Sequence, residues 1–142
     1  MVKRGGNGPF DDMRVKNGVR YTYTITARDQ AGNVTARKVH ATPGPHLLFP
    51  IGGARFLSPP RLAWTPVRGA TYYNVQLFRG SRKLLSVWPA YPKLALTRSW
   101  TFAHRRFHLG PGRYRWYVWP GLGARRTASY GPLIGSGTFV VG

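Results

Sequence analysis

The segment from Arg20 to Arg28 alternates between two kinds of side chain, and this alternation constrains the fold more than any other feature of the sequence. The odd positions carry Tyr21, Tyr23, Ile25 and Ala27, with threonines between them. A period of two in β-branched and aromatic residues predicts a half-buried β-strand. The segment "DQAGN" (29–33) supplies Gly and Asn, which suit a hairpin turn. We therefore expect a second strand over 34–41.

The segment "TPGPH" (42–46) follows this predicted hairpin. Two prolines and a glycine within five residues are typical of a stiff linker at a domain boundary. The sequence thus predicts two parts, residues 1–43 and residues 46–142.

The second part contains short apolar runs separated by Pro and Gly, and it has no helical periodicity. Within residues 72–78, Tyr73, Val75 and Leu77 are expected to face a core. We expect "HRRFH" (104–108) to be a loop. The predicted strands are residues 61–64, 72–78, 84–88, 99–102, 113–119 and 137–141. Regularly spaced short strands with turn signals predict an all-β antiparallel sandwich.

Three segments carry a resemblance to a known family: "VKNGVRYTYTITARDQAGN" (15–33), "PPRLAWTPVRGATYYNVQL" (59–77) and "LGPGRYRWYV" (109–118). They resemble the fibronectin type III domain family in its bacterial form. The resemblance implies an immunoglobulin-like (fibronectin type III-like) antiparallel β-sandwich. It implies a partial copy in residues 1–43, limited to the last two strands, and a full copy in 46–142. Tyr21 and Tyr114 would form tyrosine corners, and Trp64 would anchor the core.

The resemblance also implies a role. Bacterial members of the family are non-catalytic spacer or adhesion modules of secreted or cell-surface multidomain proteins. Extracellular or cell-surface localisation would follow, with other domains of a larger chain or cell-surface polymers as partners. Because two strands are marginal by themselves, the first part must dock, pair or stay partly disordered. We expect the chain to be a fragment, and a homo-oligomer formed through the N-terminal hairpin is the alternative.

The net charge of +19, from 22 Lys and Arg against 3 Asp and Glu, predicts attraction to polyanions. Nucleic acid, anionic glycopolymers and acidic lipid headgroups all carry the complementary charge. A compositional preference for arginine explains the same excess, and both interpretations stay open. Cysteine is absent, which excludes disulfides and thiolate chemistry. Since no run of about 18 apolar residues exists, no membrane span is expected.

The sequence offers little material for catalysis. Glutamate is absent, and the side-chain carboxylates are those of Asp11, Asp12 and Asp29. Asp11 and Asp12 are neighbours in a predicted loop, whereas Asp29 lies in a predicted turn. His104 and His108 are flanked by arginines, which oppose metal binding. We therefore predict no catalytic, cofactor or metal site, and a protein that is not an enzyme.

The best functional candidate is a surface. If Tyr114, Trp116 and Val118 face the core, the alternate residues of that strand face outward. The even positions of 72–78, Asn74 among them, would face the same way. The predicted surface comprises Tyr72, Gln76, Phe78, Arg113, Arg115, Tyr117 and Trp119, with Arg125 and Arg126 on the loop beyond. Aromatic rings stack on sugars or bases and Arg pairs with phosphate or carboxylate, which predicts polyanion binding. Packing against the hairpin or a neighbouring domain is the alternative.

Overall fold

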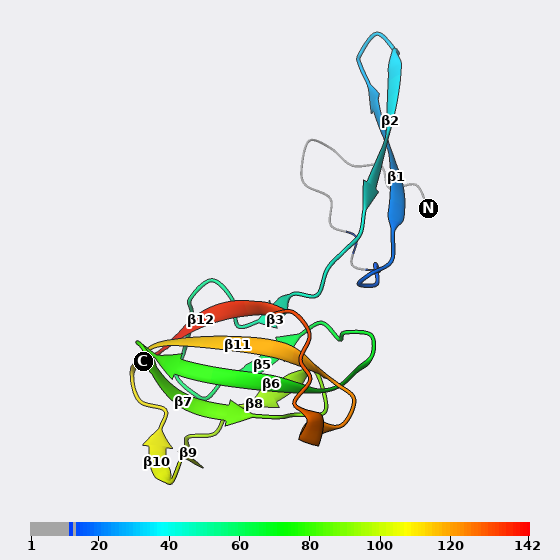
Figure 1. Cartoon of the computed structure of the whole chain (residues 1–142). Coiled ribbons are helices and arrows are strands. Elements are labelled where there is room, and N and C mark those ends of the chain that lie inside the picture. The colour runs from blue at the N-terminus through cyan, green and yellow to red at the C-terminus, as the bar shows by residue number, and fades with distance from the viewer. Residues whose placement is uncertain (1–11, 13) are drawn as a thin grey trace. The chain divides into compact units, whose positions relative to one another are not determined.

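The computed structural model describes residue 12 and residues 14–142, and the chain divides into two compact units, Met1–Gly44 and Pro45–Gly142 (Figure 1). The division falls inside the predicted linker. Asp11 lies outside the described residues, so the loop predicted around Asp11 and Asp12 is described only at Asp12.

The first unit is a β-hairpin of β1 (Tyr21–Arg28) and β2 (Val34–Ala41), paired antiparallel. Its turn is closed by Asp29, whose carboxylate accepts hydrogen bonds from the backbone amide and the side-chain amide of Asn33, both at 2.8 Å. These bonds lower the pKa of the Asp29 carboxyl, because they favour its ionised form. Gly32 adopts a φ of +90°, which explains the glycine at this position.

The start of β1 is held by the hydroxyl of Tyr21, which accepts a hydrogen bond from the backbone amide of Lys16 at 2.8 Å. The backbone amide of Gly18 donates to the carbonyl of Pro43 at 2.8 Å, which links the two ends of the hairpin. The Tyr21 hydroxyl is thus bonded to backbone five residues upstream.

The second unit contains two sheets and a separate hairpin. The five-stranded sheet has the order β4-β12-β11-β6-β7, and only its β4–β12 pair is parallel. Its strands are β4 (Ala54–Phe56), β6 (Ala70–Arg79), β7 (Arg82–Val87), β11 (Gly112–Leu122) and β12 (Gly135–Val141). The three-stranded sheet has the order β3-β5-β8, formed by β3 (Leu47–Phe49), β5 (Arg61–Trp64) and β8 (Lys93–Ala95). The hairpin comprises β9 (Ser99–Phe102) and β10 (Arg105–His108), and a 3-10 turn, η1 (Arg125–Thr127), precedes β12.

The two sheets enclose one core. Trp64 of β5 packs against Trp116 of β11 with ring centroids 6.1 Å apart, and against Tyr73 of β6 at 5.2 Å. All three side chains are almost fully buried. Leu77 and Val75 of β6 complete this layer, as the alternation along residues 72–78 predicts. The described chain is therefore all-β, with the layered architecture of a β-sandwich, and Trp64 is confirmed as a core residue.

Tyr114 fixes the entry into β11. Its hydroxyl donates to the carbonyl of Gly110 at 2.7 Å, and its ring stacks on Phe139 with centroids 5.2 Å apart. The guanidinium of Arg79 lies 5.7 Å from the same ring and donates to the carbonyl of Pro111 at 2.7 Å. The end of β6 and the start of β11 are thus joined through one buried tyrosine.

The prediction of a loop over residues 104–108 is wrong, because Arg105–His108 forms β10. The hairpin turns through Ala103 and His104, both of which have positive φ. Trp100 of β9 stabilises it by stacking on Phe107 and by donating its indole N–H to the carbonyl of Leu84 at 2.7 Å. The stacking joins the two strands of the hairpin, and the bond to Leu84 reaches a strand outside it, which the local sequence did not indicate. Strands β3, β4 and β8, each of three residues, were also not predicted.

The corner of Tyr114 yields a stability prediction. Tyr114→Phe should lower the free energy of unfolding by about 1–3 kcal/mol, because the part-buried carbonyl of Gly110 loses its donor. Chemical denaturation followed by the fluorescence of buried tryptophan measures this loss. Tyr91→Phe is the matched control, since Tyr91 is 71% exposed and should leave the midpoint unchanged. Equal midpoints for the two variants would reject the role of the hydroxyl.

Candidate functional site

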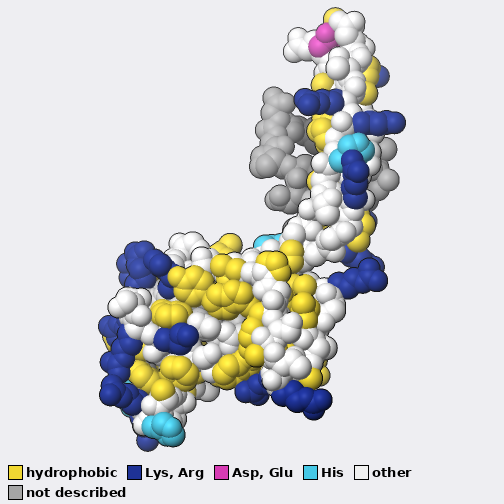
Figure 2. All heavy atoms as spheres, in the orientation of Figure 1, with side chains coloured by type: hydrophobic (Ala, Val, Ile, Leu, Met, Phe, Trp, Pro, Cys, Tyr) yellow, Lys and Arg dark blue, Asp and Glu magenta, His cyan; other side chains and the backbone are white. Residues whose placement is uncertain are grey.

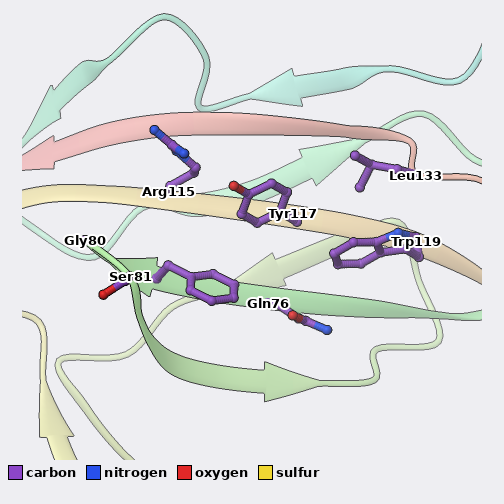
Figure 3. Close-up of a pocket in the computed structure, with 8 residues that line it drawn as sticks. Gln76, Gly80, Ser81, Arg115, Tyr117, Trp119 and Leu133 are labelled. Atoms are coloured by element: carbon purple, nitrogen blue, oxygen red, sulfur yellow. The ribbon is translucent and has the colours of Figure 1, made fainter.

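The outer face of the five-stranded sheet carries an open groove with a volume of about 390 Å³. Side chains of β6 and β11 form its floor, and the β6–β7 turn and the segment before β12 form its rims (Figure 3). Arg115, Tyr117 and Trp119 follow one another along β11, with Gln76 on the neighbouring strand. The groove is lined by Gln76, Phe78, Gly80, Ser81, Arg115, Tyr117, Trp119 and Leu133.

Three rings form an aromatic row in this groove, consisting of Phe78, Tyr117 and Trp119. Phe78 meets Tyr117 edge to face with centroids 5.6 Å apart. Tyr117 and Trp119 lie 5.9 Å apart with only 21° between their planes. The ammonium of Lys83 lies 5.6 Å from the centroid of Phe78. All three rings are half-buried, so each retains surface that a ligand can contact.

A chain of polar side chains fixes the carboxamide at the floor of the groove. The Gln76 amide donates to the Asn74 carbonyl oxygen at 2.7 Å, and the Asn74 amide donates to the hydroxyl of Ser86 at 3.1 Å. Asn74 is only 6% exposed. Its expected outward exposure is therefore wrong, because its neighbours on β6 and β7 cover it.

Tyr72 is also misplaced by the sequence prediction, since it is only 5% exposed. Its ring lies over Gly121, where a Cβ would come within 2.1 Å of the ring atoms. Tyr130 covers it edge to face at 5.9 Å. Burial, followed by the neighbouring Tyr130, raises the pKa of the Tyr72 hydroxyl. Tyr72 is therefore a packing residue beneath the β11–β12 connection and does not line the groove.

The two loop arginines lie at the other end of β11 from Arg113. The guanidinium of Arg125 lies 4.4 Å from the ring of Trp88, whose indole N–H donates to the Tyr130 hydroxyl at 2.8 Å. Arg126 is exposed on the same 3-10 turn. Neither residue lines the groove.

The structure thus brings five of the nine predicted surface residues into one groove: Gln76, Phe78, Arg115, Tyr117 and Trp119. Arg113 is exposed on the same side of β11. Sequence reasoning missed Gly80, Ser81 and Leu133. The predicted turn after residue 78 could have indicated Gly80 and Ser81, whereas no local signal pointed to Leu133.

The second unit has no acidic side chain, because Asp11, Asp12 and Asp29 all belong to residues 1–44. Of the 22 Lys and Arg in the chain, 8 lie in residues 1–44, which leaves 14 in the second unit. All 14 are exposed, and only Lys83 and Lys93 among them are lysines. Figure 2 shows several of these side chains along the end of the unit where β10 lies and others near the end where η1 lies. No side-chain carboxylate within the unit neutralises this field.

Residue 12 and residues 14–142 contain no cluster of three or more His, Cys, Asp or Glu side chains that could hold a metal ion. Within the same residues, no helix has the length and apolar character needed to cross a membrane.

Comparisons of the chain with protein-family models, with curated proteins and with solved structures found no match. The function is therefore argued from the groove, the aromatic row and the charge.

The position of Arg115 in the groove yields a second stability prediction. Arg115→Ala should change the free energy of unfolding by no more than about 0.5 kcal/mol, because the side chain is exposed. Trp116→Ala, one residue away, should cost about 3–5 kcal/mol through the cavity left in the core. Denaturant titration of both variants checks the alternation of β11. Comparable losses in the two variants would contradict the assignment of faces.

Proposed function

We propose that the second unit is a fibronectin type III-like, immunoglobulin-like sandwich and that the first unit is a partial copy of the same fold. The strand order supports this proposal. The β3-β5-β8 sheet corresponds to strands A, B and E of an immunoglobulin-like domain, and β7-β6-β11-β12 corresponds to C′, C, F and G. The bond from the Tyr114 hydroxyl to the carbonyl of Gly110 has the form of a tyrosine corner at the start of strand F.

On this fold we propose a non-catalytic adhesion module of a secreted or cell-surface bacterial multidomain protein, which binds an anionic polymer through the groove. One observation carries the proposal. The aromatic row stays partly exposed beside Arg115, in a unit that holds 14 cations and no acidic side chain. An anionic polymer is complementary to both features. Its charged groups pair with arginine, and its sugar or base rings cover the aromatic surface.

The physical basis is a division of roles. Arginine presents a planar fork that matches phosphate or carboxylate with two parallel hydrogen bonds. The aromatic row supplies apolar contact at fixed positions, because contacts between its rings hold them in place. The charge attracts the polymer over a distance of about 8–10 Å, and the rings then set where it lies.

The remaining parts of the proposal concern assembly. Other domains of a larger chain and cell-surface polymers are the expected partners of such a module, and a spacer role is compatible with them. In the first unit, β1 and β2 are both edge strands. Among the described residues, no third strand pairs with either of them. Such edges suit pairing with a second copy, so a homo-oligomer through this hairpin stays a prediction.

The binding function is tested with the full chain on immobilised polygalacturonate, on immobilised oligodeoxythymidylate and on neutral dextran. We expect retention on at least one anionic matrix, release as salt rises, and no retention on dextran. Tyr117→Ala should weaken binding about tenfold, because one aromatic contact is lost.

Tyr91→Ala is the matched control, since this exposed tyrosine does not line the groove of the five-stranded sheet. It should bind like the unaltered chain. Failure of every anionic polymer at low salt, or equal binding by the Tyr117 and Tyr91 variants, would reject the groove as the binding site.

A further inference from the structure

We infer that the polymer is single-stranded nucleic acid, and that its strand runs from the groove over Arg82 onto the β9–β10 hairpin. The inference rests on the proposed binding function and names its ligand. Four observations support it: the aromatic row, the arginines beside it, the continuity of cations toward β10, and the lack of acidic side chains.

The first observation is the placement of flat rings on adjacent central strands. Phe78 lies on β6, and Tyr117 and Trp119 lie on β11, the strand paired with it. The planes of Tyr117 and Trp119 differ by only 21°. Aromatic side chains on the central strands of a sheet form platforms on which two or three unpaired bases stack. Every base has a flat face, so such a platform accepts any sequence.

The second observation is the kind of cation beside the row. Arg113 and Arg115 are exposed on the same side of β11 because they are two residues apart. Arg115 pairs across the sheet with Phe78, which places a guanidinium next to the aromatic row. Twelve of the 14 cations in the unit are arginines. The planar guanidinium is suited to the two-point recognition of phosphate, and it also stacks on rings.

The third observation is a continuous path from the groove to the hairpin. Gly80 and Ser81 form one rim of the groove. The next residue, Arg82, places its guanidinium 5.2 Å from the ring of Phe107 on β10. Phe107 stacks in turn on Trp100, which fixes the hairpin to the sheet.

The hairpin then offers His104, Arg105, Arg106 and His108, all exposed. A backbone of regularly spaced phosphates can follow this path once its bases lie on the aromatic row. Because the second unit has no Asp or Glu, no side-chain carboxylate in it competes with the phosphates for these cations.

These features favour a single strand over two other polyanions. A duplex keeps its bases stacked inside, so the aromatic row would contact only sugar and phosphate. A polyuronate has carboxylates but no aromatic rings, so it gains charge pairing without base stacking. The ligand that uses both the rings and the cations is an unpaired nucleic acid.

The test measures fluorescence anisotropy of the full chain with a labelled oligodeoxythymidylate at a series of salt concentrations. The same oligonucleotide paired with its complement, and polygalacturonate as a competitor, are the comparison ligands. We expect the single strand to bind tightest at equal salt. Tyr117→Ala should reduce its affinity about tenfold while changing duplex affinity little. Binding of the single strand should quench tryptophan fluorescence, and the extent of this quenching should be smaller in Trp119→Phe.

The path over the hairpin is tested with R105Q/R106Q. Each phosphate contact on a single strand contributes about 0.7 to the slope of log affinity against log salt, so this variant should have a slope shallower by about 1.4. R68Q/K93Q is the matched control, because it removes the same charge from exposed positions in the β5–β6 turn and on β8. Its slope should equal that of the unaltered chain. Thermal melting confirms that both variants fold.

The outcomes separate the inference from the function on which it rests. If polygalacturonate or the duplex binds as tightly as the single strand, and Tyr117→Ala still weakens that binding, the groove stands and the nucleic-acid inference is overturned. If R105Q/R106Q and R68Q/K93Q have equal slopes, the path over the hairpin is overturned. If no anionic polymer binds, both the proposed function and the inference fail.

Discussion

The packing of Trp116 against Trp64 is the contact on which the second unit depends. It joins the central strand of the five-stranded sheet to the middle strand of the other sheet, and both indoles are almost fully buried. The indole N–H of Trp116 donates to the carbonyl of Pro50 at 3.2 Å. Gly137 of β12 makes room for this ring, since a Cβ there would lie 2.5 Å from the indole nitrogen. Because side chains alternate along β11, burying Trp116 places Arg115 and Tyr117 on the opposite face. The groove is therefore a geometric consequence of the core.

The sequence predicted those parts of the fold in which alternation and burial agree. On β11, residues 113–119 alternate between core and outer face as expected, and β5 was predicted with its observed bounds. The predicted exposure of Tyr72 was wrong because alternation indicates only the side of the sheet on which a residue lies. Whether a residue on that side is exposed depends on what covers it, and Tyr130 comes from a connection some sixty positions later. β10 was missed for a similar reason. Its arginine-rich sequence is typical of a loop, and it is held as a strand by the stacking of Trp100 on Phe107 and the bond from Trp100 to Leu84.

In a unit without acidic side chains, aromatic rings take the place of carboxylates as partners for the cations. Four such contacts are described, with the charged group 4.4–5.7 Å from the ring centroid: Arg79 on Tyr114, Arg82 on Phe107, Lys83 on Phe78 and Arg125 on Trp88. The ring face carries negative charge density, so each contact stabilises by about 0.5–1 kcal/mol at exposed sites.

The difference between a ring and a carboxylate matters for binding. A salt bridge neutralises its cation, and an incoming anion must displace the carboxylate. A ring carries no net charge, so a guanidinium stacked on it keeps its charge and its N–H donors for another partner. Mutual repulsion among 14 cations opposes the compact state of the free unit. Under the proposed function, a polyanion that binds the folded unit more tightly than the unfolded chain adds to folding stability. Under the proposed function, the arginines that repel one another in the free unit would pair with an anionic polymer, while ring contacts position Arg79, Arg82 and Arg125.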